Sequence, residues 1–150
     1  MIKLIAIVDS HWGISKNGEI PWSFREDMEF FRKKTTNSVV VMGKNTFLSL
    51  PDRPLKNRIN CVISRDAAIH GVENFKSLED VTVEYDDFWI IGGAKLYNYA
   101  LENNLVDYAL ITMANQNHNA DKFLDLFPEK FRQKTVFCGA RYLIIEFEAK

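Results

Sequence analysis

The chain has 150 residues, enough for one compact domain with a sizeable core. Apolar residues make up 47% of it and charged residues 26%, which is the usual balance of a soluble globular protein. With 19 basic and 20 acidic residues the net charge is −1, which excludes a surface built for non-specific binding to nucleic acid or to anionic membranes.

The chain begins with a short apolar run, LIAIV at residues 4–8, which Asp9 closes. The run is too short for a signal-peptide core or a transmembrane span, so we expect a buried strand and a cytoplasmic protein. Cys61 and Cys138 both lie in apolar segments. We expect both to be buried free thiols in a reducing compartment, although the sequence leaves a disulfide between them open.

A long loop follows the first strand, from Asp9 to Ser23. Loops of that length inside a small domain are often lids or binding segments. Trp22 comes directly after Pro21, where its ring N–H would stand at the entrance of the next helix. Taken alone, Trp22 is better interpreted as a core residue that follows a helix-start proline.

A helix expected at residues 24–34 carries an acidic residue on its apolar side. At 100° per residue, Asp27 projects among four apolar side chains, namely Phe24, Met28, Phe30 and Phe31. A buried ionised carboxylate is costly unless something pairs with it. The helix offers no partner on that face except Lys34 at its end, so we infer that the partner is a ligand.

Strands and helices alternate along most of the remaining chain. Four further strands are predicted, at 38–43, 59–64, 87–92 and 108–114, with helices at 44–49, 77–82 and 94–102. This alternation predicts a mainly parallel sheet in an α/β domain. The tail differs, because runs at 131–138 and 141–149 joined by Gly-Ala indicate an antiparallel hairpin. The expected fold is one domain over residues 1–150, a mixed and mainly parallel sheet with helices on both faces and a C-terminal antiparallel hairpin.

Two strand-to-helix corners of this sheet carry glycine. One strand ends at Gly43 before Lys44, and another ends at Gly92 and Gly93 before Lys95. Free backbone N–H groups at a helix N-terminus bind phosphate well. Arg65 follows a third strand, so three cations near the corners of one sheet would suit a multiply charged nucleotide.

Each corner taken alone is weak evidence. Neither matches the Walker pattern or G-x-G-x-x-G, so a standard dinucleotide fold is not indicated. A double glycine after a strand more often serves tight helix–strand packing than phosphate binding. Only the set of corners favours a nucleotide site.

Taken together, these segments resemble the dihydrofolate reductase family along nearly the whole chain. The segments that carry the resemblance are, in order, IAIV, GISKNGEIPW, Asp27 in the first helix, VVVMGKNTF, LPDRPLKNRINCVISR, WIIGGAKLY and Thr112 in LIT. Their joint order and spacing are specific, whereas each segment alone is not. The resemblance implies reduction of dihydrofolate by hydride transfer from NADPH to C6, with a proton delivered to N5.

By this resemblance the ligand partner of Asp27 is the pterin ring, which donates two hydrogen bonds from N3 and the 2-amino group. The implied catalytic residues are Asp27, Trp22, which holds a bridging water, and Thr112, which hydrogen-bonds Asp27. The backbone carbonyls of Ile5 and Ile91 meet the other edge of the pterin. The resemblance further implies that apolar side chains line the pocket, and these are Met28, Phe31, Leu50 and Leu55.

The resemblance also assigns Arg58 to the substrate, as the clamp on its glutamate α-carboxylate. The alternative for Arg58 is a solvated surface arginine. The family places the cofactor on the two glycine corners and beside the 9–22 loop, and the implied residues are Ala6, Ile14, Ile20, Gly43, Lys44, Asn45, Thr46, Ser64, Arg65, Gly92, Gly93, Ala94, Lys95, Leu96 and Tyr97. Lys44, Ser64 and Arg65 match positions around the adenosine 2′-phosphate, which favours NADPH over NADH.

The chain departs from the family pattern in the lid and in the loop that supports it. Family members commonly have glycine where this chain has Ser15, and glycine where it has Ala120. Asp121 is the nearest match to the aspartate that supports the closed lid. These changes put lid closure and product release in doubt, but not the chemistry of the pocket.

We expect no metal site, because His11, His70 and His118 lie in loops without ligand spacing. The other expectations are dihydrofolate as the small-molecule partner, no nucleic acid, no membrane, and a monomer. Two alternatives stay open. One is the NADPH-dependent reductase domain of riboflavin synthesis on the same fold, which Asp27 and Arg58 disfavour. The other is a catalytically silent nucleotide- or antifolate-binding module, which the intact set of site residues disfavours.

Overall fold

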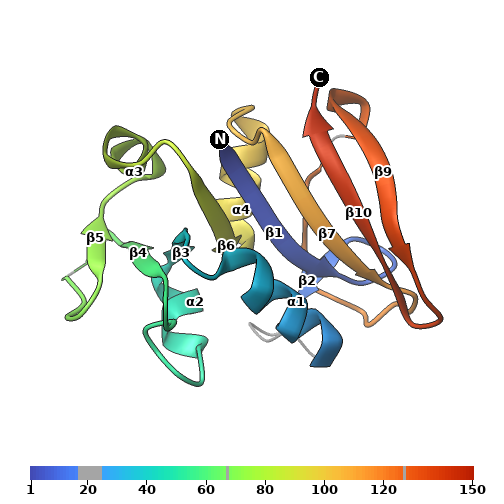
Figure 1. Cartoon of the computed structure of the whole chain (residues 1–150), viewed down its shortest axis with the longest axis horizontal. Coiled ribbons are helices and arrows are strands. Elements are labelled where there is room, and N and C mark those ends of the chain that lie inside the picture. The colour runs from blue at the N-terminus through green and yellow to red at the C-terminus, as the bar shows by residue number, and fades with distance from the viewer. Residues whose placement is uncertain (17–24, 67, 127) are drawn as a thin grey trace.

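An eight-stranded sheet forms the frame of the molecule (Figure 1). The computed structural model describes residues 1–16, 25–66, 68–126 and 128–150. The strand order is β5-β4-β3-β6-β1-β7-β10-β9. The first six of these are parallel to one another, and they are β5 (Glu73–Phe75), β4 (Ile59–Ile63), β3 (Val39–Gly43), β6 (Phe88–Gly92), β1 (Ile2–Val8) and β7 (Tyr108–Ala114).

The C-terminal hairpin completes the sheet on one side. Strand β10 (Tyr142–Ala149) pairs antiparallel with β7, and β9 (Phe131–Cys138) pairs antiparallel with β10 at the sheet edge. The mixed, mainly parallel sheet with a C-terminal hairpin confirms the predicted fold class. Cys138 corrects one expectation, because it is exposed. It lies on the edge strand, whereas Cys61, also a free thiol, is buried on the inner strand β4.

Two helices cover each face of the sheet. Helices α1 (Arg25–Thr35) and α2 (Lys44–Ser49) pack phenylalanines into the core cluster on one face. Helices α3 (Leu78–Glu84) and α4 (Ala94–Glu102) pack into the cluster on the other. In Figure 1, α1 stands in front of the sheet and α4 behind it. All four helices lie within two residues of the predicted bounds.

Local chemistry explains where several of these helices start and stop. The Ser77 side chain caps α3 by accepting a hydrogen bond from the Asp80 amide at 3.1 Å. Helix α1 ends before Asn37, which has a left-handed backbone (φ 62°). Three basic residues occupy its last turn, where they complement the negative end of the helix dipole.

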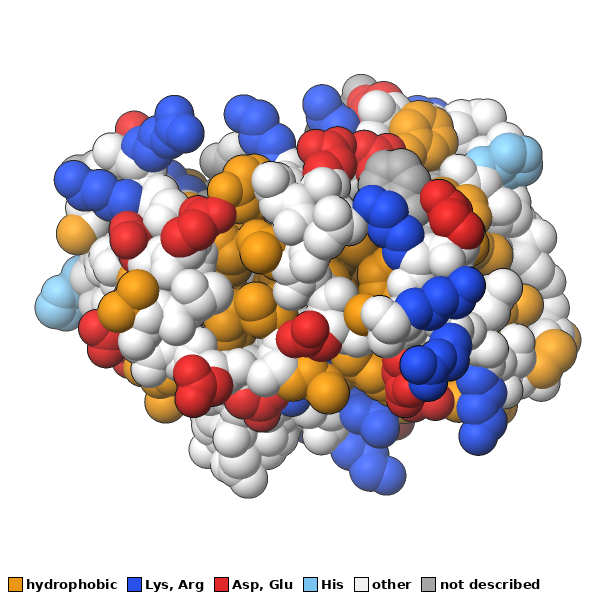
Figure 2. All heavy atoms as spheres, turned by 90° about the horizontal axis from the view of Figure 1, so that it is seen from above, with side chains coloured by type: hydrophobic (Ala, Val, Ile, Leu, Met, Phe, Trp, Pro, Cys, Tyr) orange, Lys and Arg blue, Asp and Glu red, His pale blue; other side chains and the backbone are white. Residues whose placement is uncertain are grey.

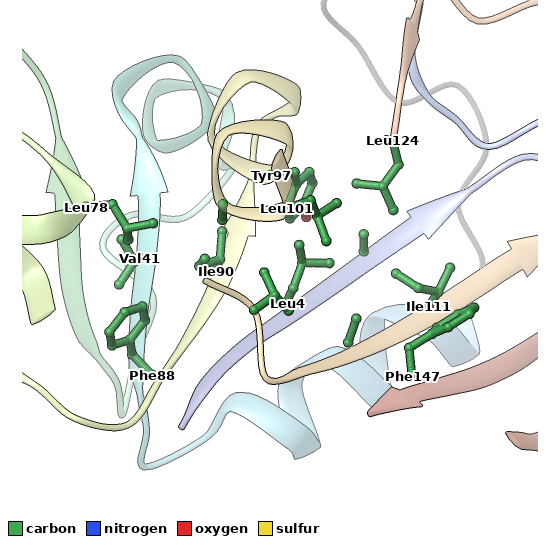
Figure 3. Packing of buried hydrophobic residues seen from close by; sticks show 14 of the residues in the cluster. Leu4, Val41, Leu78, Phe88, Ile90, Tyr97, Leu101, Ile111, Leu124 and Phe147 are labelled. Atoms are coloured by element: carbon green, nitrogen blue, oxygen red, sulfur yellow. The ribbon is translucent and has the colours of Figure 1, made fainter. Parts of the chain in front are cut away.

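The larger core cluster lies between the sheet and the helices of the α4 side (Figure 3). Leu4 and Ile90 from the central strands meet Tyr97 and Leu101 from α4, and all are at most 5% exposed. Ile111 and Phe147 extend the cluster across β7 and β10. This packing fixes the central strands, whose carboxyl ends carry the predicted site.

A second, two-stranded sheet was not predicted from the sequence. Strand β2 (Gly13–Ser15) pairs antiparallel with β8 (Lys122–Phe123). Strands of three and two residues are too short for an alternating pattern to show. The pairing joins the start of the 9–23 loop to the segment after β7, and a 3-10 turn at Pro128–Lys130 then leads into β9.

Basic and acidic side chains are interspersed over the face shown in Figure 2, and apolar atoms show between them near the centre. This mixture agrees with the net charge of −1. Within the described ranges, no helix is long and apolar enough to cross a membrane.

Candidate active site

Asp27 is the centre of the candidate site. Helix α1 presents it half-buried, and the side chain of Thr112, on β7, hydrogen-bonds its carboxylate. Burial raises the pKa of Asp27 above its ordinary value, and the Thr112 hydrogen bond lowers it in part. Thr112 is itself buried at 3% exposure. The fold therefore brings Asp27 and Thr112 together from distant parts of the sequence, and the catalytic roles of both residues stay a prediction.

Apolar side chains from α1 and from the connection after α2 pack together on the α1 face of the sheet. Phe31 from α1 packs against the same core cluster as Leu50 and Leu55 from the connection after α2. All three are half-buried. Met28 is 60% exposed, so it lies outside the packed core. Its role in the pocket stays a prediction.

Strand β1 and helix α4 are joined by a buried hydrogen bond. The Tyr97 hydroxyl donates to the Ile5 carbonyl oxygen at 2.7 Å, and this contact is buried. Burial raises the pKa of Tyr97, and the charge of Asp27 raises it further, which places the phenol near that carboxylate. Ile5 lies on β1 and Ile91 on β6, the neighbouring strand, so both predicted pterin-facing carbonyls belong to adjacent strands.

Arg58 is not a freely solvated side chain. It is half-buried, donates to the Thr35 hydroxyl at 2.9 Å and to the Lys56 carbonyl at 2.9 Å, and its guanidinium lies 5.9 Å from the Phe31 ring centre. Burial lowers the pKa of Arg58, and the charge of Arg32 lowers it further. The contacts with Thr35 and Phe31 place Arg58 against α1, at the end of the apolar group formed by Phe31, Leu50 and Leu55.

The two predicted glycine corners are neighbours in space. A Cβ atom added to Gly93 would lie 3.1 Å from the Thr46 hydroxyl oxygen, and one added to Gly92 would lie 3.4 Å from it. Gly92 also has φ +136°, a conformation that residues with side chains rarely adopt. Helix α4 has no side-chain cap at Gly93. Its first backbone N–H groups therefore stand beside the start of α2.

Cations and hydroxyls surround this pair of corners. Lys44 Nζ lies 3.0 Å from Asp66 Oδ2, and the Asp66 amide donates to the Ser64 hydroxyl at 3.1 Å. Arg65 and Lys95 are exposed. The pairing of Lys44 with Asp66 was not predicted from the sequence.

The other predicted cofactor residues lie on the same elements. Ala6 and Ile14 are buried, at 7% and 5% exposure. Gly43 lies at the end of β3, Asn45 is exposed in α2, and Ala94 and Leu96 are half-buried in α4. Trp22 and Ile20 lie outside the described residues, so their predicted roles are not placed.

Comparison with known proteins decides the family. A family model described as "Dihydrofolate reductase" matches residues 1–136. The chain belongs to the dihydrofolate reductase family. It is 34% identical to the "Dihydrofolate reductase" of Ureaplasma parvum (83% of this chain, 81% of that protein) and 33% identical to that of Bos taurus (85% and 79%). It is 29% identical to that of Pneumocystis carinii (89% and 76%).

Membership of the dihydrofolate reductase family makes the chain an oxidoreductase of tetrahydrofolate biosynthesis.

The two departures from the family pattern, Ser15 and Ala120, lie at the small sheet or beside it. Ser15 is the last residue of β2, and its carbonyl accepts a hydrogen bond from the Asp121 amide at 3.0 Å. A Cβ atom added to Gly13 would lie 2.3 Å from that of Ala120, so the alanine methyl occupies the space above Gly13.

Sequence reasoning missed the buried polar residues Asn60 and Asp9, which lie on strands of the candidate site or directly after them. Asn60 is 7% exposed in β4, and its amide bonds the backbone of Leu55 twice, at 2.9 Å each, and the Arg58 carbonyl at 3.1 Å. Asp9 is 0% exposed. A polar residue inside or directly after an apolar run was the available signal, because buried polar groups require partners.

Proposed function

We propose that this protein reduces 7,8-dihydrofolate to 5,6,7,8-tetrahydrofolate with NADPH, as a cytoplasmic monomer that supplies one-carbon units for thymidylate and purine synthesis. The observation that carries the proposal is the half-buried Asp27 carboxylate with Thr112 as its hydrogen-bond partner. Among the described residues Thr112 is the side chain that hydrogen-bonds this carboxylate, and a carboxylate has more acceptor sites than one hydroxyl fills. A pterin ring, which presents two donors side by side, matches them.

In this mechanism Asp27 orients the substrate. A bidentate pair between a carboxylate and the N3 and 2-amino groups is geometrically selective and strong in an apolar site. Thr112 holds the carboxylate in position, and the Ile5 and Ile91 carbonyls accept from the other pterin edge. The Ile5 carbonyl also accepts from Tyr97, so the second lone pair of that oxygen is the one available to the substrate. Trp22 holds a water near the pterin.

By the family resemblance Asp27 does not act as a simple direct acid on the reduced carbon, and its proposed contribution is orientation and charge. The carboxylate favours the protonated form of the bound ring electrostatically. Phe31, Leu50, Leu55 and Met28 keep water away from the ring system. Arg58, which Thr35 holds against α1, is placed to pair with the substrate's glutamate carboxylate through its guanidinium fork.

The glycine corners fit a dinucleotide. Gly92 and Gly93 leave the backbone open where a side chain would meet Thr46, and the uncapped start of α4 offers N–H groups to a pyrophosphate. Lys44, Ser64 and Arg65 would hold the 2′-phosphate. Ala6, Ile14, Ile20, Asn45, Ala94, Lys95, Leu96 and Tyr97 complete the proposed cofactor contacts with Gly43 and Thr46. NADPH supplies the hydride for C6 when bound.

The proposal is tested by the loss of reduced-nicotinamide absorbance when purified protein meets NADPH and dihydrofolate, with NADH and methotrexate reactions alongside. Methotrexate-sensitive oxidation that is faster with NADPH supports the substrate, the cofactor and the pocket together. A folded protein that binds NADPH but oxidises none contradicts the proposal. That result would favour the riboflavin-pathway substrate or a silent binding module.

A further inference from the structure

The carboxylate of Asp9 is completely buried and is surrounded by backbone amides. It follows β1 directly and is 0% exposed. Its Oδ1 accepts from the His11 and Gly13 amides, each at 2.8 Å, and its Oδ2 accepts from the His118 amide at 3.1 Å. Burial alone would raise the pKa of Asp9, but these N–H groups and the charge of His11 hold it below its ordinary value.

The two carboxylate oxygens have different tasks. The bonds from His11 and Gly13 close a local turn, which the Asp9 amide reinforces by donating to the Gly13 carbonyl at 2.9 Å. The bond from His118 instead spans 109 residues and reaches the segment after β7. One side chain thus fixes the turn and ties it to a distant part of the chain.

Further contacts bring the same two segments together. The Ser10 amide donates to the Gln116 carbonyl at 3.0 Å, and β2 pairs with β8. The Ala120 methyl fills the space above Gly13, where an added Cβ would also lie within 2.9 Å of both Asp9 oxygens. Asp9, Gly13 and Ala120 therefore form one packed unit.

This unit carries Ile14, the residue after Gly13, which is 5% exposed and belongs to the proposed cofactor site. We propose that Asp9 is a positioning residue that holds Gly13–Ser15 against the 115–121 segment and thereby sets the position of Ile14 in the proposed cofactor site. The inference rests on the proposed function, because the position of Ile14 affects binding only if NADPH is the cofactor of this site.

The substitution Asp9→Asn should affect the local turn and the bond to His118 differently. In Asp9→Asn, the remaining side-chain oxygen can still accept from His11 and Gly13, whereas the new NH₂ group faces the His118 N–H, so that two donors meet. Asp9→Ala removes all three hydrogen bonds. Asp86→Asn is the matched control, because Asp86 is exposed and lies just before β6, at the amino end of the parallel strands.

Amide hydrogen exchange followed by NMR reports on the hydrogen bonds of Asp9 and does not depend on enzymatic turnover. We expect Asp9→Asn to keep the protection of the Gly13 amide and to lose that of His118. The dissociation constant of NADPH, measured by fluorescence titration, should rise about fivefold, the lower end of typical coupling between sites. The KM of dihydrofolate should change less than that of NADPH. Asp9→Ala should weaken NADPH binding further, and Asp86→Asn should match the parent protein in every measurement.

Unchanged NADPH binding in Asp9→Asn, with the His118 protection lost, would overturn the positioning role. Gly13→Ala tests the same unit if Asp9→Asn does not fold, because its methyl group would meet Ala120 and the Asp9 oxygens. It should weaken NADPH binding, and adding Ala120→Gly should restore part of the affinity. If neither change affects NADPH binding, the inference is wrong. A parent protein that binds NADPH but does not reduce dihydrofolate would contradict only the proposed reaction.

Discussion

A single side chain, Asp27, links the stability of the free protein to its proposed chemistry. The fold half-buries this carboxylate, and among the described residues Thr112 supplies its hydroxyl partner, so its ionised form is less well solvated than in the unfolded chain. A substrate that donates two hydrogen bonds would remove that cost. Binding-site residues commonly reduce stability for this reason.

Asp27→Asn should therefore lose most turnover at neutral pH. The amide keeps one acceptor but cannot supply the charge that favours the protonated pterin, and its NH₂ group opposes a substrate donor. Activity should recover in part at low pH, where the substrate is already protonated. The measurement is kcat and kcat/KM between pH 5 and 8, and full activity at neutral pH would remove Asp27 from the catalytic group.

The same substitution should stabilise the ligand-free protein at neutral pH. Because the pKa of Asp27 is raised in the folded state, the native protein binds this proton more tightly than the unfolded chain does. The cost is absent below the ordinary carboxyl pKa, about 3.9, and is fully present once the pH exceeds the raised value.

The stability advantage of Asp27→Asn should accordingly be largest at neutral pH and fall to zero on acidification towards that ordinary value. Each kcal/mol gained should raise Tm by about 2–4 °C in a chain of this size. Thr112→Val serves as the opposite control, because removing the hydroxyl should raise the Asp27 pKa further and lower Tm at pH 7. An Asp27→Asn variant that is less stable than the parent protein at pH 7 would contradict the argument.

Lys44 and Asp66 give a second prediction at the scale of single residues. A bound 2′-phosphate must compete with Asp66 for Lys44, whose ammonium lies 3.0 Å from that carboxylate. Asp66→Asn should increase the preference for NADPH over NADH, and Lys44→Ala with Arg65→Ala should narrow it. Each change should be up to about fivefold, because exposed ion pairs contribute up to about 1 kcal/mol.

The preference is read from the ratio of kcat/KM values for NADPH and NADH at low and high salt. The effect of Asp66→Asn should shrink at high ionic strength, because both partners are partly exposed. An unchanged ratio in both the Asp66 variant and the double variant would move the 2′-phosphate site elsewhere.

At the scale of whole elements, two asparagines on neighbouring strands each hydrogen-bond the backbone of the connection that precedes their strand. Asn60 in β4 fastens the connection that contains Leu55 and Arg58, and Asn74 in β5 fastens the backbone of Ile69 and Val72 in the same way. Only the first connection carries proposed substrate residues. Substitutions of the two asparagines can therefore be compared to distinguish the general effect of losing a loop anchor from a specific effect on the substrate site.

Asn60→Ala should raise the KM of dihydrofolate several-fold with little change in the KM of NADPH, because Leu55 and Arg58 are no longer held in place. It should also lower the free energy of unfolding by about 1–3 kcal/mol, the cost of leaving buried polar groups unpaired. Asn74→Ala should leave the KM of dihydrofolate unchanged. Equal effects of the two variants on that KM would contradict the role given to the Asn60 connection.

These elements also mark how far the sequence predicts the structure. Long apolar runs such as 38–43 identified the main strands, because burial on both faces leaves a continuous signal. The amphipathic arc of the first helix singled out Asp27. The β2–β8 pairing was missed because its strands are too short. The tasks of Asp9 and Asn60 were missed because their partners are backbone groups, whose positions depend on how distant segments come together.

At the scale of the whole molecule, the sheet assembles the candidate site from segments that are far apart in sequence. Asp27, Thr112 and the glycine corners belong to α1, β7, β3 and β6, which the parallel order brings to one region. Charges of both signs are mixed over the face shown in Figure 2. We therefore expect discrimination between NADPH and NADH to come from the proposed local group of Lys44, Ser64 and Arg65, since the net charge is only −1.

Cofactor binding should consequently raise the free energy of unfolding and the Tm of the whole domain. NADPH at 100 times its dissociation constant should stabilise the native state by about 2.7 kcal/mol, because it binds the folded chain alone. With about 2–4 °C per kcal/mol, Tm should rise by roughly 5–10 °C. NADH at the same concentration should raise Tm less, since it lacks the 2′-phosphate. Adenosine 2′,5′-bisphosphate should stabilise more than adenosine 5′-monophosphate, which isolates the 2′-phosphate from the nicotinamide. Thermal melts measure these shifts. Equal Tm shifts for NADPH and NADH, and equal shifts for the bisphosphate and the monophosphate, would show that Lys44 and Arg65 do not recognise the 2′-phosphate.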